Sequence, residues 1–273
     1  MTMLALIRDT FREALARKIF WGLFALSTLM ILFFLFLLRI DIVQGATATI
    51  SLFGVNEART VDAARLIQRV YGAIATFLYT WGMFLAVFAS SGLVPSILEP
   101  GRIELLLSKP VTRGQILLGR YLGNLLVVSL NICYLVAGVW LVLGTKTGIW
   151  TPNFLYSIAT TIFLFAVLLT VIFFIGVLFE SAALAVMVTV ALMMMSPILA
   201  QNKVAEKLLS SQWSRDLWNG LYHVLPKAYD MGRMTLDLVY ERRAADLGPV
   251  WSSAAFGLVL FVLSFLIFLR RDY

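Results

Sequence analysis

Long uncharged runs alternate with short charged segments along this chain. The uncharged runs are 19–38, 70–98, 121–145, 147–179, 181–202 and 247–269. A helix needs about 20 predominantly apolar residues to cross the hydrocarbon core of a bilayer, and each run is long enough. The pattern therefore predicts an all-α membrane protein with about six transmembrane helices.

We place the spans at 19–39, 72–98, 116–143, 154–179, 181–201 and 250–269. Only Glu180 separates the fourth run from the fifth. A carboxylate at mid-membrane is costly, so we expect a tight turn at this position. No long polar stretch remains for a second domain, and residues 1–273 are predicted to form a single transmembrane domain.

The N-terminal residues have the pattern of an amphipathic helix. One helical face carries Leu4, Ile7, Phe11, Ala14 and Leu15. Glu13 and Arg17 have the i,i+4 spacing of a favourable ion pair on the polar side. We therefore predict an interfacial helix over 3–17 that turns into the first span.

Two further segments, 40–70 and 202–249, are expected to lie outside the membrane. In the second, apolar residues recur with roughly helical spacing at Val204, Leu208, Trp213, Leu217 and Leu221. This pattern predicts an amphipathic helix on the membrane surface. The dipeptide Leu225–Pro226 should end it, because the residue before a proline disfavours the helical conformation.

The composition agrees with a membrane protein. Hydrophobic residues make up 61% of the chain and charged residues 14%, against about 25% charged in an ordinary soluble domain. The net charge of +7 lies mainly at the ends of apolar runs, where Lys and Arg contact lipid headgroups, so no nucleic-acid partner is expected. The basic residues next to the first, third and sixth spans favour cytoplasmic N- and C-termini.

The segment between the second and third runs is the most informative part of the sequence. Residues 99–113 read EPGRIELLLSKPVTR, and residues 114–123 read GQILLGRYLG. Pro100–Gly101 is a turn signal, and Pro110 ends any helix that begins after it. The segment thus predicts a short helix, with Glu and Arg on one side and Leu on the other, lying across the cytoplasmic face.

This segment closely resembles the cytoplasmic loop of ABC-2-type transporter permeases. In that family a Gly-x-hydrophobic-Glu-Leu-Leu-Leu-Ser-Lys-Pro-Val-x-Arg run precedes the third span, and the resemblance covers 99–123. Tyr222 to Lys227 is similar to a Tyr-x-x-Leu-Pro element often found in the family's late loop. Pro100 departs from the family, which commonly has a Glu-rich approach here.

The resemblance implies a permease subunit of an ABC exporter in the bacterial inner membrane. Its short cytoplasmic helix would couple to a separate cytoplasmic ABC ATPase subunit, which holds ATP and Mg²⁺. Membrane lipid and a second permease copy or a relative would be the other partners, in a dimer of permeases. The residues assigned to coupling are Glu99, Gly101, Arg102, Ile103, Glu104, Leu105, Leu106, Leu107, Ser108, Lys109, Pro110 and Arg113.

Four residues of the third span are further candidates. Gly119 and Gly123 form a small-xxx-small pair suited to close helix packing. Ser129 and Asn131 are polar residues inside the span. Hydrogen bonding between helices is the simpler interpretation for them, and contact with a transported substrate is the alternative.

The sequence does not favour catalysis or metal binding on this chain. Residues 144–147 read GTKT but lack the glycine directly before the lysine that a P-loop needs. Cys133 is the single cysteine and His223 the single histidine, and Met193, Met194 and Met195 point in different directions on a helix, so no metal site is expected. We expect no catalytic residue and no cofactor on this chain. A secondary transporter or an intramembrane enzyme without an ATPase partner is the alternative function.

Overall fold

The computed structural model describes Arg8, Ala16 and residues 10–13, 18–43, 47–52, 55–56, 61–91, 112–201, 211–240 and 247–270. The helices are α2 (Lys18–Leu37), α3 (Ala63–Ser91), α5 (Arg113–Thr147), α6 (Tyr156–Phe179), α7 (Ala182–Leu199), α9 (Gln212–Val224), α10 (Ala228–Val239) and α11 (Gly248–Arg270). A 3-10 turn, η2 (Pro152–Leu155), leads into α6.

Within the described residues, five helices are long and apolar enough to cross a membrane. They are Ile67–Ser90, Arg113–Thr147, Pro152–Phe179, Ala182–Leu199 and Gly248–Arg270, and Phe20–Phe36 is a shorter apolar helix. The prediction of an all-α membrane protein is confirmed. Six spans would require the shorter helix to cross the membrane as well, so the count of six stays a prediction.

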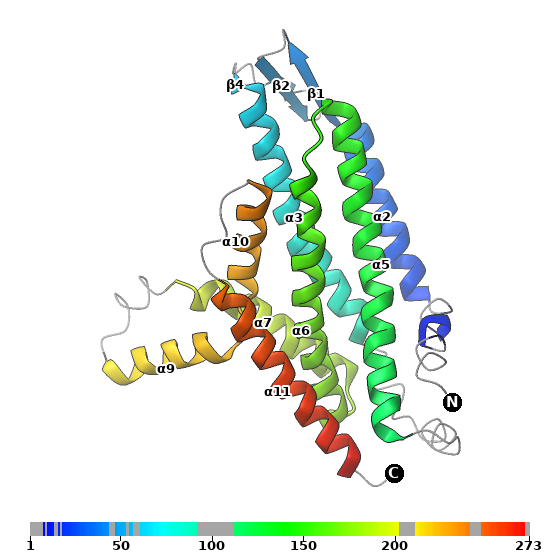
Figure 1. Cartoon of the computed structure of the whole chain (residues 1–273), viewed down its shortest axis with the longest axis vertical. Helices are drawn as coiled ribbons and strands as arrows, with labels where there is room; N and C mark the ends of the chain where they lie inside the picture. Colours follow the sequence, from blue (N-terminus) through cyan, green and yellow to red (C-terminus); the bar gives the residue numbers. More distant parts are fainter. Residues whose placement is uncertain are drawn as a thin grey trace.

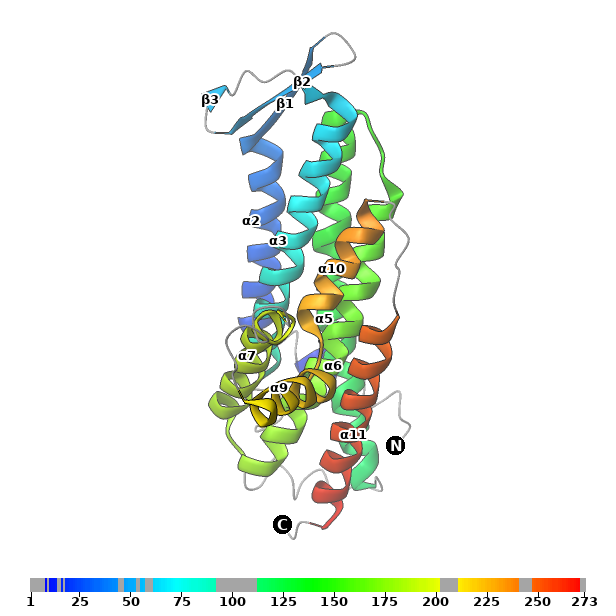
Figure 2. The ribbon, with the colours of Figure 1, turned by 90° about the vertical axis from the view of Figure 1, so that its left-hand side faces the viewer.

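Successive long helices run in opposite directions, and a small sheet lies at one end of the bundle (Figures 1 and 2). Its strands are β1 (Leu38–Val43), β2 (Thr47–Leu52), β3 (Val55–Asn56) and β4 (Val61–Asp62). β1 and β2 are antiparallel, with registers from Leu38↔Leu52 to Val43↔Thr47, and both β3 and β4 pair with β2. We expected only a polar segment over 40–70, so this sheet was not anticipated.

Helix α6 is the centre of the bundle. In its most apolar stretch 67% of the residues are buried, against 22% in α7 and in α11. It packs against α3, α5, α7, α10 and α11. Phe165, Leu168 and Ile172 have no exposed surface. A helix that is apolar on all sides suits a position enclosed by other helices, and these five helices surround α6.

A turn separates α6 from α7 at Glu180. This residue has a φ of 55°, in the left-handed region, and its N–H donates to the carbonyl of Gly176 at 3.0 Å. Ser181 then caps α7 by accepting a hydrogen bond from the N–H of Leu184 at 3.3 Å. Glu180 is exposed, so its carboxylate lies at the end of the bundle rather than inside it.

The part of the expected external segment 202–249 that is described over 211–240 contains two helices instead of one. α9 ends just before Leu225–Pro226 and lies across the bundle (Figure 1). α10 packs against α3 and α6: Tyr79 Oη donates to the carbonyl of Ala228 at 2.6 Å, and Thr235 Oγ1 donates to Thr160 Oγ1 at 2.8 Å. The second half of this segment is therefore part of the helical bundle.

Glycine allows α3 and α10 to approach closely. A Cβ atom at Gly72 would overlap the Tyr240 ring, whereas a Cβ at Gly82 on the same helix would meet nothing within 4 Å. We expect Gly72→Leu to lower the free energy of unfolding by about 1–3 kcal/mol, because overpacking displaces neighbouring side chains. Thermal unfolding in detergent measures this, and Gly82→Leu is the matched control. Equal melting temperatures for the two variants would contradict the close contact.

Candidate functional site

Most of the residues assigned to coupling lie outside the described residues. These are Glu99, Gly101, Arg102, Ile103, Glu104, Leu105, Leu106, Leu107, Ser108, Lys109 and Pro110. Their role stays a prediction from the sequence. Arg113 is described, and it is the first residue of α5. The structure therefore shows the elements to which the coupling segment connects.

The start of α5 is well capped. Thr112 Oγ1 accepts a hydrogen bond from the N–H of Gln115 at 3.3 Å, and Gln115 Oε1 accepts one from the N–H of Thr112 at 3.1 Å. This reciprocal capping box satisfies two backbone donors at a helix start. The capping box therefore stabilises the first turn of α5, which follows the coupling segment.

The same turn contacts the end of α11. Arg113 Nη1 donates to the carbonyl of Leu269 at 3.3 Å, so a cation lies at the negative C-terminal end of the α11 dipole. One residue later, a Cβ at Gly114 would come within 2.5 Å of the Phe265 ring. The start of α5 and the end of α11 are therefore joined by a polar and an apolar contact.

The N-terminal segment packs on the next turns of α5. Arg120 Nη1 and Glu13 Oε2 form an ion pair, and the side chains are only 6% and 17% exposed. A Cβ at Gly123 would come within 2.5 Å of the Thr10 Cβ atom, so the missing side chain makes room for this segment. Gly119 is also buried. Gly123 thus makes a close contact with the N-terminal segment, and packing through Gly119 stays a prediction.

Further polar residues continue along α5. Asn124 Oδ1 accepts a hydrogen bond from Ser90 Oγ of α3 at 3.2 Å, and Asn131 Oδ1 accepts one from Ser27 Oγ of α2 at 3.0 Å. Asn131 therefore joins two helices, which is the simpler of its two interpretations. Ser129 is half-buried on α5. The amide nitrogens of both asparagines are buried without a partner in the described part of the chain.

Sequence reasoning missed the Glu13–Arg120 pair. It paired Glu13 with Arg17, which lies outside the described residues, so that pair stays a prediction. It counted Arg120 only as one of several basic residues near the membrane. A signal was available: Arg120 falls seven residues inside α5, where an arginine facing other helices needs a carboxylate partner.

Metal binding and phosphate binding were the other kinds of site to look for within the described residues. No group of three or more His, Cys, Asp and Glu side chains within them is placed to hold a metal ion. Residues 144–147 form the last turn of α5 before Gly148 rather than a loop around a phosphate. The first turns of α5 instead make contacts that join α5 to α11 and to the N-terminal segment.

We expect Glu13→Gln and Arg120→Gln each to lower the free energy of unfolding by about 3–5 kcal/mol, because either change leaves a buried charge unpaired. The double variant should recover part of this loss. Thermal unfolding of the purified chain in detergent, analysed as a double-mutant cycle, measures the coupling. Arg12→Gln is the control, since Arg12 is exposed on the same segment. Additive losses would contradict a direct ion pair.

Comparison with known proteins identifies the family. No curated protein matches the sequence. The family model described as ABC-2 family transporter protein matches residues 4–273, which is nearly the whole chain. The match includes every described helix and the segment 99–123 on which the resemblance rests. This integral membrane protein therefore belongs to the ABC-2 family of transporter proteins.

Proposed function

We propose that this chain is the permease subunit of an ATP-driven ABC exporter. A separate cytoplasmic subunit would bind ATP and Mg²⁺ and hydrolyse the nucleotide. The family match over residues 4–273 is the observation that carries the proposal. The motif at 101–113 supports it, because this is the segment that would dock on the ATPase.

The contacts at the start of α5 support a route for transmitting movement. The coupling segment, residues 101–110, which we call the docking segment from here on, is followed by the capping box at Thr112. From there α5 contacts α11 through Arg113 and the N-terminal segment through Arg120. A shift of the docking segment would therefore move three elements together. Packed elements of this kind switch between discrete arrangements, and nucleotide binding to the ATPase would shift the populations of these arrangements.

A second permease copy or a relative would complete the transport pathway. Apolar side chains on the outer faces of α2 and α11 are exposed, among them Phe36 and Leu258. Lipid or a partner permease would cover them, since neither face suits contact with water. The two permeases would then enclose a route between them.

The proposed orientation follows from the docking segment. The start of α5 and the end of α11 lie at one end of the bundle, and the sheet lies at the other (Figures 1 and 2). An ATPase at the former end makes that end cytoplasmic in a bacterial inner membrane. The sheet β1–β4 would then lie on the outer side, and both chain termini in the cytoplasm.

The docking assignment predicts the effect of a charge reversal. Glu104→Arg, or deletion of Leu105–Leu107, should abolish association with the ATPase while the chain still inserts into the membrane, because the docking helix loses its charge pattern or its apolar face. Pull-down of the tagged chain from solubilised membranes measures the ATPase, identified by a Walker A peptide. Arg215→Glu on the exposed side of α9 is the matched control. Normal co-purification of the ATPase after either change would exclude docking at this segment.

The orientation predicts a labelling pattern. In a Cys133→Ser background, single cysteines replace Ser108 and Ser210. A membrane-impermeant maleimide added to intact cells should label Ser210→Cys and leave Ser108→Cys unmodified until the cells are opened. Labelling of Ser108→Cys from outside would contradict the proposed orientation.

A further inference from the structure

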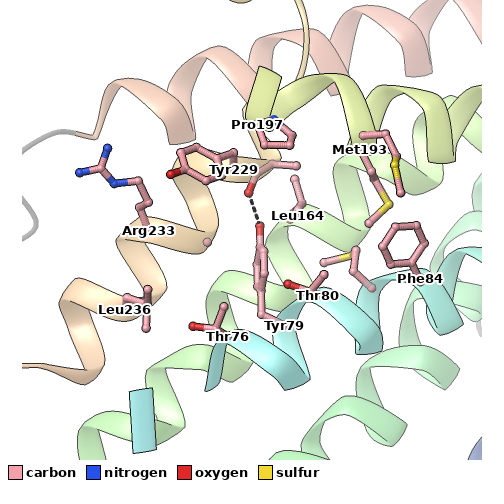
Figure 3. Close-up of a pocket in the computed structure, with 14 residues that line it drawn as sticks. Thr76, Tyr79, Thr80, Phe84, Leu164, Met193, Pro197, Tyr229, Arg233 and Leu236 are labelled. Atoms are coloured by element: carbon pink, nitrogen blue, oxygen red, sulfur yellow. Dashed lines mark hydrogen bonds between the residues drawn. The ribbon is translucent and has the colours of Figure 1, made fainter. Parts of the chain in front are cut away.

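A cavity of about 380 Å³ lies where α3, α7 and α10 meet, with Leu164 of α6 behind it (Figure 3). Its volume falls within the range of about 300–1,000 Å³ that is usual for small-molecule sites. The cavity lies away from the start of α5, so none of the contacts assigned to coupling forms it. The residues assigned to function from the sequence also do not line it.

The walls of the cavity suit hydrocarbon. Phe84 of α3 and Met193 of α7 line one side of it. Two of its hydroxyl groups are already used: Tyr79 Oη donates to the carbonyl of Ala228, and Thr76 Oγ1 donates to the carbonyl of Gly72 at 2.9 Å. Thr80 and Tyr229 also line the cavity, but most of its wall is hydrocarbon, so a mainly polar ligand would lose more contacts with water than the cavity replaces.

Arg233 of α10 gives the cavity one charged edge. It is the one charged residue among the described residues that line the cavity, and it is exposed. Asp230 and Asp237 flank it along α10, and Asp230 Oδ2 already accepts a hydrogen bond from Tyr222 Oη at 2.9 Å. Figure 3 places Arg233 on one side of Tyr79, with Met193 and Phe84 on the other. The cavity therefore has a cationic end and an apolar end.

The opening of the cavity faces the outer surface of the bundle. Thr76, Thr80, Met194 and Tyr229 line it and are exposed together with Arg233. Two of the helices that frame it, α3 and α7, are apolar and long enough to cross a membrane. A ligand would therefore enter sideways from the bilayer rather than from water.

We propose that this cavity binds the acyl chain of an anionic amphiphile from the membrane, with the acidic head group at Arg233. A guanidinium offers paired N–H donors that match a carboxylate or a phosphate, and these charge-assisted hydrogen bonds are the stronger ones. A free fatty acid and an acidic phospholipid share this chemistry. The binding does not depend on the proposed function, since it is a property of this chain without an ATPase.

Photolabelling tests the site directly. The purified full chain in dodecyl maltoside is irradiated with palmitic acid that carries a diazirine on its acyl chain, and labelled peptides are identified by mass spectrometry. We expect labels on the peptides that contain Phe84 and Met193. Oleate should compete, and oleyl alcohol should compete about tenfold less well, as the loss of one charge-assisted interaction implies. Competition by phosphatidylglycerol would identify a phospholipid as a ligand, and its failure would identify a free fatty acid.

Matched variants separate the two ends of the site. Thr80→Trp fills the cavity and should reduce labelling at least about fivefold, while Phe77→Trp, which lies in a different pocket of α3, should not. Arg233→Gln should weaken competition by oleate about tenfold and leave oleyl alcohol unchanged. Arg69→Gln, an exposed arginine of α3 that does not line the cavity, is its control. Labelling unaffected by Thr80→Trp, or equal competition by oleate and oleyl alcohol, would overturn the proposal.

Discussion

The burial of Arg120 is the constraint on which the arrangement around the start of α5 depends. A charged side chain that is nearly inaccessible in an apolar bundle is costly unless a carboxylate reaches it. Glu13 is that carboxylate, and it comes from the N-terminal segment. The ion pair therefore fixes this segment against α5, and Gly123 provides the space in which Thr10 lies against the helix. A segment that would otherwise rest only on lipid becomes part of the bundle.

Small residues and satisfied polar groups organise the remaining helix contacts in the same way. Lipid tails are as apolar as leucine, so helices in a bilayer associate through close packing and hydrogen bonds rather than by the hydrophobic effect. Gly138 accommodates Ile31 where α5 and α2 meet, and Gly72 accommodates Tyr240 between α3 and the end of α10. Each of these contacts lies beside a hydrogen bond that joins the same elements, such as the one from Ser27 to Asn131.

Hydropathy was enough to find the membrane-spanning helices, because such a helix is recognised by the length of its apolar run and by the lack of charged residues in it. The resemblance at 99–123 was enough to find the family. The sheet was missed, although LRIDIV and TATISL contain the β-branched residues and alternation of strands. The packing of α10 was missed because its polar residues suggested an exposed loop. Such a position depends on partners distant in the sequence, such as Tyr79 and Thr160, which periodicity does not identify.

The same limit applies to function. Spacing alone marked Gly119 and Gly123 as packing residues, but only the fold shows that the N-terminal segment occupies the space at Gly123. Arg233 did not stand out in the sequence, and its place beside an apolar cavity follows from the packing of α10 against both α3 and α7. One element thus contributes both to the stability of the bundle and to a candidate lipid site.

We propose that an ATPase binds this chain through residues 101–110, just before α5. Site-specific photo-crosslinking tests it most directly. Benzoylphenylalanine replaces Ile103, or Leu217 on the exposed face of α9 as the reference position, and cells are irradiated before purification. The account predicts that position 103 captures a protein with a Walker A motif and that position 217 does not. Capture of such a protein from position 217 alone, or from neither position when the chain is inserted and intact, would contradict the account.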